Sequence, residues 1–160
     1  MSHLPSTPPE PWHSFLTELD QTASEEVRLE CLGGFVVTQL YGRQRSTADI
    51  DILFAVPGLD QKLIEKTRQG SELHKKYGVY LDVVGVASLP YNYDERLKEM
   101  FPRAYRHLRL FALDPYDLAL TKLSRNIERD RDDVKYLART IPFDLRSFKI
   151  DMKTSYGLML

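Results

Sequence analysis

The sequence predicts an α/β (α+β) domain in which short buried strands alternate with amphipathic helices. Val27–Leu32 alternates apolar and charged residues with the period of two that is typical of a half-buried strand. Two further runs, Ile50–Val56 and Val79–Val86, are apolar except for one aspartate each, which indicates buried strands. A segment from Asp114 to about Arg139 carries strong helix signals. The 160 residues suit one domain.

The N-terminal segment is expected to be an extended lead-in followed by a helix. Residues 1–11 contain four prolines, which favour a poorly ordered chain. The next helix is predicted over Pro11–Ala23, since proline suits an opening turn and Phe15, Leu16 and Leu19 share one face.

The middle of the chain alternates between strand and helix signals. Gly33-Gly34 ends the first predicted strand, and the pattern of Phe35–Tyr41 is compatible with either a strand or a helix. The other elements expected here are a helix over Gln61–Tyr77, capped by Asp60, weakened by Gly70 and stopped by Gly78, then a short helix over Asp94–Met100 and a strand over Tyr105–Ala112.

The last predicted element is a single long helix. Asp114 is placed as its N-cap, Pro115 occupies the first helical position and Asp117 lies in the first turn. The expected organisation is a core over residues 12–112, this C-terminal helix over 113–141 and a tail over 142–160. The predicted apolar stripe of the helix consists of Tyr116, Leu120, Leu123, Ile127, Val134 and Leu137.

Composition excludes several classes of protein. Twenty-two Lys and Arg against 23 Asp and Glu leave a net charge of −1, so there is no overall positive field to collect nucleic acid. The single cysteine, Cys31, excludes an internal disulfide and is expected to be a buried small hydrophobe. Because no signal-peptide pattern or long apolar run is present, we expect a cytoplasmic protein without a membrane partner.

Three aspartates form the candidate catalytic and metal-binding group. Asp49 and Asp51 are two residues apart, so a strand would place both carboxylates on one side. Their mutual repulsion is relieved when a cation binds, and Mg²⁺ typically takes one or two protein carboxylates together with phosphate oxygens. Asp82, in an otherwise apolar run, would be costly to bury without a partner. A neighbouring strand would let it join the pair as ligand or general base.

Glycines and polar residues upstream of the acids suggest a phosphate contact. Gly33 and Gly34 would let the backbone approach a phosphate closely, although a simple tight turn explains them equally well in isolation. Arg45 and Thr47 add a cation and a hydroxyl just before the acid pair.

Taken together, these segments resemble the DNA polymerase β-like nucleotidyltransferase superfamily. The resemblance lies in Leu32-Gly33-Gly34-Phe35 followed by Asp49-Ile50-Asp51-Ile52. Tyr41–Thr47 is similar to small bacterial abortive-infection, toxin-type nucleotidyltransferases and to related families of unknown function, as are Asp117–Leu123 and Asp130–Val134. The resemblance implies a nucleotidyltransferase fold, with a mixed β-sheet flanked by helices and a C-terminal helix packed on the core.

The same resemblance implies the site and the activity. Mg²⁺, or Mn²⁺, would be held by Asp49, Asp51 and Asp82, with Lys122 and Arg129 reaching the phosphates of a nucleoside triphosphate (NTP). The implied reaction moves a nucleoside monophosphate from the NTP to a hydroxyl of RNA, such as tRNA, or of protein. The setting would be a toxin–antitoxin or phage-defence system with a cognate partner. The alternative is an inactive nucleotide-binding or antitoxin-like regulatory module that acts through a protein partner.

Overall fold

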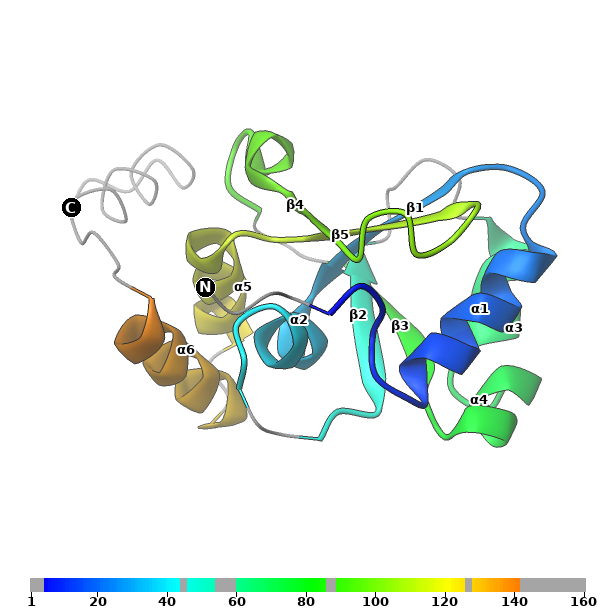
Figure 1. Ribbon diagram of the computed structural model, residues 1–160. Helices are drawn as coiled ribbons and strands as arrows, with labels where there is room; N and C mark the ends of the chain where they lie inside the picture. Colours follow the sequence, from blue (N-terminus) through cyan, green and yellow to red (C-terminus); the bar gives the residue numbers. More distant parts are fainter. Residues whose placement is uncertain (1–4, 44–45, 54–59, 86–88, 126–127, 142–160) are drawn as a thin grey trace. The chain divides into compact units, whose positions relative to one another are not determined.

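The computed structural model (Figure 1) describes residues 5–43, 46–53, 60–85, 89–125 and 128–141. The chain divides into two compact units, Met1–Gly85 with Glu99–Ala112 and Val86–Lys98 with Leu113–Leu160. The elements are α1 (Trp12–Thr22), β1 (Val27–Leu32), α2 (Gly33–Gln39), β2 (Asp49–Leu53), α3 (Gln61–Thr67), α4 (Glu72–Tyr77), β3 (Tyr80–Val84), the 3₁₀ turn η1 (Tyr93–Arg96), β4 (Lys98–Met100), β5 (Leu108–Ala112), α5 (Pro115–Arg125) and α6 (Glu128–Thr140).

A mixed β-sheet is the frame of the fold. Its strand order is β3-β2-β1-β5-β4, so β1 is central and β3 lies at an edge. β1 runs antiparallel to β2 and parallel to β5, whereas β2 and β3 are parallel. The expected α/β (α+β) class, with a mixed sheet and accompanying helices, is therefore confirmed.

One face of the sheet carries the apolar core. Cys31 and Ile52 are register partners on this face, and both are fully or almost fully buried. Burial raises the pKa of the Cys31 thiol, with Glu30 and Asp51 adding to the effect, and the expectation of a buried small hydrophobe is confirmed. The other buried residues on this face are Val27, Leu29, Ile50, Leu81, Leu108, Leu110 and Ala112.

The first strand is buried on both faces rather than half-buried as predicted. Glu30, which the alternation placed on a solvated side, is only 6% exposed. The reason is its position in the central strand, where Arg28 lies within 3.5 Å of its carboxylate and Phe111 is its partner on β5. A two-residue period identifies the faces of a strand, but strand order decides whether both are covered.

The expected helix at Pro11–Ala23 is confirmed as α1, which attaches to the sheet region in two ways. Trp12 packs edge-on against Phe35 of α2, with ring centroids 5.0 Å apart. Near its other end, the carboxylate of Asp20 accepts hydrogen bonds from the backbone N–H groups of His107 (2.6 Å) and Leu108 (2.9 Å). Burial opposes ionisation of this carboxylate, yet these donors lower the pKa of Asp20 below its ordinary value.

Two helix predictions in the middle of the chain require correction. The segment Gln61–Tyr77 forms two helices, because Gly70 between them has a φ of +84° that no helix accommodates. Each has its own cap: Asp60 accepts from the N–H of Leu63 (2.8 Å), as predicted, and Ser71 accepts from the N–H of His74 (3.2 Å).

The segment Phe35–Tyr41, whose pattern was compatible with a strand or a helix, is helical up to Gln39, where α2 ends.

The predicted short helix at Asp94–Met100 is also wrong in its second half. Only Tyr93–Arg96 is helical, as a 3₁₀ turn, and Lys98–Met100 is strand β4 beside β5. A cross-strand contact supports this pairing, since Arg109 donates to Glu99 over 3.4 Å. Tertiary pairing thus overrides the local helical preference of this charged segment.

The C-terminal segment forms two helices, α5 and α6, instead of one. Along a continuous α-helix, Lys122 and Asp133 would be separated by about 16 Å of rise. In the structure their charged atoms are 2.7 Å apart, so the chain must turn back between them. The predicted single stripe is therefore wrong as a continuous surface. Pro142 and the tail lie outside the described residues, as do residues 1–4 of the lead-in.

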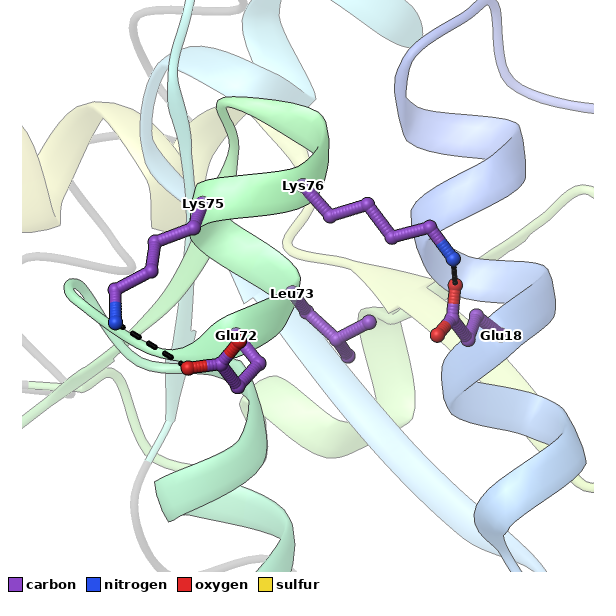
Figure 2. A pocket seen from close by; sticks show the side chains of 5 residues that line it. All are labelled: Glu18, Glu72, Leu73, Lys75 and Lys76. Atoms are coloured by element: carbon purple, nitrogen blue, oxygen red, sulfur yellow. Dashed lines mark hydrogen bonds and ion pairs between the residues drawn. The ribbon is translucent and has the colours of Figure 1, made fainter.

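A surface pocket of about 500 Å³ lies between α1 and α4 (Figure 2). Lys76 forms an ion pair with Glu18 (2.7 Å), and Lys75 pairs with Glu72 (3.2 Å). The charged side chains that line the pocket therefore balance one another.

Within the described residues, no helix combines the length and apolar character that crossing a bilayer requires.

The start of α5 contains a buried acid. Asp114 accepts from the N–H of Asp117 (2.9 Å), which confirms it as the predicted cap. Arg96 donates two hydrogen bonds of 2.9 Å to the Asp117 carboxylate. Burial nevertheless raises the pKa of Asp117 to about 6, because desolvation outweighs the pull of Arg96.

We expect Asp117 to make the protein less stable as the pH rises. Its pKa in the folded state exceeds that of an ordinary aspartate, so between pH 4 and 6 the folded state binds more protons than the unfolded state. The free energy of unfolding of the wild type, minus that of Asp117→Asn, should fall by about 2–3 kcal/mol from pH 4 to pH 7. Urea unfolding at each pH measures this difference. A flat or rising difference would mean that the ion pair with Arg96 dominates.

Candidate active site

The three predicted aspartates lie together on one face of the sheet. Asp49 and Asp51 alternate along β2 with the buried Ile50 and Ile52, and Asp82 is the register partner of Asp51 on β3. One carboxylate oxygen from each of Asp49, Asp51 and Asp82 lies within 4.8 Å of the others. The parallel pairing of β2 and β3 thus forms the cluster that the two-residue spacing and the isolated Asp82 suggested.

Asp82 is exposed, so the prediction that it lies buried in its strand was wrong. The reason is that β3 is an edge strand, and the face that carries Asp82 is not covered there within the described residues. Its carboxylate therefore carries no large desolvation cost that a partner would have to offset. Its importance lies in its register with Asp51, which apolar neighbours in the sequence do not reveal.

Gly33 closes the cluster from the side of β1. It has a φ of +77°, and a Cβ atom placed on it would lie 2.2 Å from Oδ2 of Asp51. The first predicted glycine is therefore required both by its backbone conformation and by the space that the Asp51 carboxylate occupies. Gly34 follows inside α2. Contact of either glycine with a phosphate stays a prediction.

Replacing Gly33 with alanine should damage the acid cluster more than the fold. Gly78 is a matched control, since its φ is +74° and nothing lies within 4 Å of the position that a Cβ atom would occupy there. Both Gly33→Ala and Gly78→Ala should cost about 1–2 kcal/mol for the left-handed backbone. Only Gly33→Ala must also displace the Asp51 carboxylate, so we expect Mn²⁺ affinity to fall at least about tenfold in that variant alone.

Urea unfolding and Mn²⁺ titration followed by electron paramagnetic resonance would measure the two quantities. Equal loss of Mn²⁺ affinity in both variants would show that backbone strain, not the contact with Asp51, is responsible.

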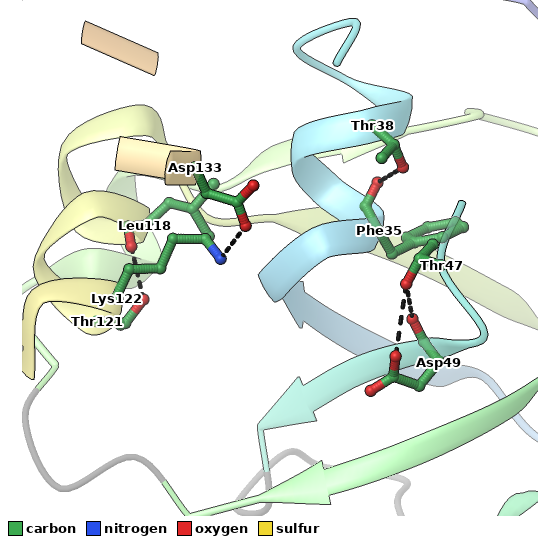
Figure 3. A network of polar contacts seen from close by, with 8 residues as sticks. All are labelled: Phe35, Thr38, Thr47, Asp49, Leu118, Thr121, Lys122 and Asp133. Atoms are coloured by element: carbon green, nitrogen blue, oxygen red, sulfur yellow. Dashed lines mark hydrogen bonds and ion pairs between the residues drawn. The ribbon is translucent and has the colours of Figure 1, made fainter. Parts of the chain in front are cut away.

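Thr47 holds the first aspartate in place (Figure 3). Its hydroxyl lies 3.1 Å from the backbone carbonyl of Asp49 and 3.4 Å from the carboxylate Oδ1 of the same residue. In this structure Thr47 orients Asp49, and its contact with a phosphate stays a prediction. Arg45 lies outside the described residues.

Tyr80 is a neighbour of the cluster that the sequence reasoning missed. It is the register partner of Asp49 and lies two residues before Asp82, so it shares the face of the acids. Burial, followed by the charges of Asp49, Asp82 and Asp51, raises the pKa of the Tyr80 hydroxyl. The signal was present in the sequence, since Tyr80 and Asp82 have the same two-residue spacing as Asp49 and Asp51.

Two of the three predicted phosphate-binding cations, Lys122 and Arg129, belong to the second unit. Lys122 on α5 is 4% exposed and forms an ion pair with the fully buried Asp133 on α6, at 2.7 Å (Figure 3). Arg129 lies in α6, but its side chain is outside the described residues. The contact of Lys122 with a nucleotide therefore remains a prediction. In the structure, the lysine is paired with the buried Asp133.

A comparison with protein families agrees with this geometry. A family model described as "Nucleotidyltransferase of unknown function (DUF6036)" matches residues 14–154. The chain belongs to this nucleotidyltransferase family. No curated protein and no solved structure matches it. The resemblance to nucleotidyltransferase-like families of unknown function is thereby confirmed.

The donor set of the acid cluster suits a hard divalent cation. All three candidate ligands are carboxylates, which Mg²⁺ and Mn²⁺ prefer, and their oxygens converge within 4.8 Å. The absence of a side chain at Gly33 leaves room for the Asp51 carboxylate itself. The arrangement can therefore hold a metal ion between two half-buried carboxylates and one exposed carboxylate.

Proposed function

We propose that this chain is a Mg²⁺-dependent nucleotidyltransferase, also served by Mn²⁺, that transfers a nucleoside monophosphate from an NTP to a hydroxyl of RNA or protein. The observation that carries the proposal is the convergence of Asp49, Asp51 and Asp82 in a chain of a nucleotidyltransferase family. A bound divalent cation would neutralise charge on the triphosphate and make the acceptor hydroxyl more acidic.

Each residue of the cluster has a distinct part in this proposal. Asp49, oriented by Thr47, and Asp51, seated against Gly33, would hold the metal on the side of β1 and β2. Asp82, exposed on the edge strand, would accept the proton of the acceptor hydroxyl. The acceptor oxygen then bonds to the α-phosphorus as the bond from that phosphorus to the bridging oxygen breaks, and pyrophosphate leaves.

The biological setting follows from the family resemblance. We propose a cytoplasmic component of a toxin–antitoxin or phage-defence system, with tRNA among the acceptors. Tyr41–Thr47, just before the acid pair, supports this subtype. Co-purification with the product of a neighbouring gene would test the partner.

Transfer of radioactivity from each α-labelled NTP would test the reaction. The purified chain is incubated with Mg²⁺ and either a total tRNA pool or a protein extract, and the products are separated on gels. We expect label on one acceptor class with the wild type, and none with Asp82→Asn or in the presence of EDTA. Label transfer that survives both Asp49→Asn and Asp82→Asn would refute the assigned site.

A second candidate function is a nucleotide-binding regulatory module without turnover. The observation that favours it is the buried pairing of Lys122 with Asp133, which leaves the predicted phosphate-binding cation engaged within its own unit. This alternative predicts that NTP with Mg²⁺ raises the unfolding midpoint but that no pyrophosphate forms. Pyrophosphate release by the purified chain would exclude it.

A further inference from the structure

Tyr80 provides an aromatic surface directly beside the three acids. It is aligned with Asp49 across β2 and β3, and Asp82 follows two residues later on the same face. The side chain is partly exposed, and within the described residues its hydroxyl forms no hydrogen bond. The Tyr80 hydroxyl is therefore not held by a hydrogen bond within the part of the chain that the structure describes.

A second ring supports Tyr80 from α4. The rings of His74 and Tyr80 meet edge-on, with centroids 4.9 Å apart and an interplanar angle of 65°. The His74 ring is itself held in place, because its Nδ1 accepts the backbone N–H of Gly70 at 2.9 Å. Tyr80 is thus a braced ring rather than a freely rotating one, which lowers the entropic cost of stacking a ligand on it.

The position of Tyr80 in the strand order indicates which substrate it would meet. Gly33, which follows β1 directly and begins α2, adjoins Asp51, whereas Tyr80 and Asp82 lie on β3, at the opposite side of β2. In the proposed function Asp49 and Asp51 hold the metal and its triphosphate on the side of β1 and β2, and Asp82 takes the proton of the acceptor, so the acceptor would approach over the edge strand β3. Tyr80 then lies along the path of the acceptor.

The charge of the chain makes an aromatic contact valuable here. With a net charge of −1, the protein has no overall field that would hold a polynucleotide by its phosphates. Stacking of bases on aromatic side chains supplies affinity without such a field and tolerates any base.

We propose that Tyr80, braced by His74, is the stacking platform for the terminal nucleobase of a single-stranded RNA acceptor. This inference rests on the proposed function, because the RNA can reach Tyr80 only if the NTP lies on the side of β1 and β2, next to Gly33. It also goes beyond that function, since it selects RNA over protein as acceptor and names the residue that binds it.

Binding of single-stranded oligoribonucleotides would test the platform without requiring turnover. We would compare six-nucleotide RNAs, labelled with fluorescein at the 5′ end, that carry either a normal or an abasic 3′-terminal ribose. Fluorescence anisotropy in Ca²⁺ gives the dissociation constants. The wild type should prefer the base-bearing end by roughly 5- to 150-fold, the range that base–aromatic stacking provides.

Three variants and a control make the test specific. Tyr80→Ala should abolish the preference for the base-bearing end, Tyr80→Phe should keep it and His74→Ala should reduce it. Tyr91→Ala is the control, since Tyr91 is a 73% exposed tyrosine of the other unit. Circular dichroism melting of each variant separates loss of binding from loss of folding.

Steady-state kinetics show whether the base that stacks on Tyr80 belongs to the RNA acceptor or to the NTP. The proposal expects Tyr80→Ala to raise KM for RNA while KM for the NTP stays constant. A raised KM for the NTP alone would place the base of the NTP on Tyr80 and overturn the proposal.

Other results separate this inference from the proposed function. A wild type that does not distinguish base-bearing from abasic RNA would refute the platform, even if nucleotidyl transfer to protein is observed. Preference for the base-bearing end in a chain that transfers no label would support the platform and refute the proposed function.

Discussion

Asp51→Asn should lower nucleotidyl transfer by about a hundredfold to a thousandfold without destabilising the metal-free fold. Asp51 is the central member of the cluster, since it lies opposite Asp82 in register and against Gly33. Removing its charge leaves Asp49 and Asp82 as the remaining carboxylates. We expect the loss mainly in kcat, because charge neutralisation at the reacting phosphate is needed most in the transition state.

Although Asp51→Asn should lower activity, it should not lower the stability of the metal-free protein. Carboxylate oxygens of the three aspartates within 4.8 Å repel one another when no cation is bound. In EDTA, the unfolding midpoint of Asp51→Asn should therefore equal or exceed that of the wild type. Added Mg²⁺ should raise the midpoint of the wild type, and of the variant much less.

Differential scanning fluorimetry with and without Mg²⁺, combined with the label-transfer assay, would measure both effects. Asp94→Asn is a matched control, because it makes the same chemical change at an exposed aspartate outside the cluster. A variant that loses activity together with several degrees of stability in EDTA would indicate that Asp51 supports the fold rather than a metal.

Lys122→Met should destabilise the protein by about 3–5 kcal/mol. The side chain of Lys122 is 4% exposed and that of Asp133 is fully buried, so the substitution leaves a buried carboxylate without its cation. The two residues belong to α5 and α6, and their ion pair joins these helices. Urea unfolding of the variant measures the loss.

The double variant Lys122→Met/Asp133→Leu should recover most of this stability. Replacing a buried ion pair with apolar side chains of similar size is often neutral, because the desolvation cost of both charges disappears. A double-mutant cycle with Asp133→Leu gives the coupling energy. If the double variant loses as much stability as the two single variants added together, the pairing is contradicted.

The double variant also tests the predicted nucleotide contact of Lys122. If the lysine reaches the phosphates, the folded double variant should show a KM for the NTP raised by at least about tenfold, as expected for loss of a charge-assisted hydrogen bond. If Lys122 only joins the helices, KM should remain unchanged. Arg103→Met changes a charge at an exposed position of the first unit and provides a control.

Local signals in the sequence were reliable where the physical cause is itself local. The caps Asp60 and Asp114 each bond to a backbone N–H three residues later, so they act within one helical turn. Gly78 ends α4 in the left-handed conformation for the same kind of reason. The Asp49–Asp51 pair shares a face because the pleat of a strand repeats every two residues.

Long-range effects account for the features that the sequence did not reveal. Glu30 is buried because its strand is central, and the Lys98–Met100 segment is extended because β5 lies beside it. The packing of α5 against α6 places Lys122 against Asp133, a pair that periodicity along one helix cannot predict. Each depends on neighbours that are distant in the chain.

The acid cluster and the glycine pair that precedes it can be identified from residue order alone, because a strand period and a family resemblance require only local order. How these parts meet depends on the pairing of the strands. The parallel register of β2 and β3 aligned Asp51 with Asp82 and brought Tyr80 beside Asp49. The close approach of Gly33 to Asp51 arose from the pairing of β1 with β2. Strand pairing sets these distances, since it joins segments whose separation along the chain carries no information about register.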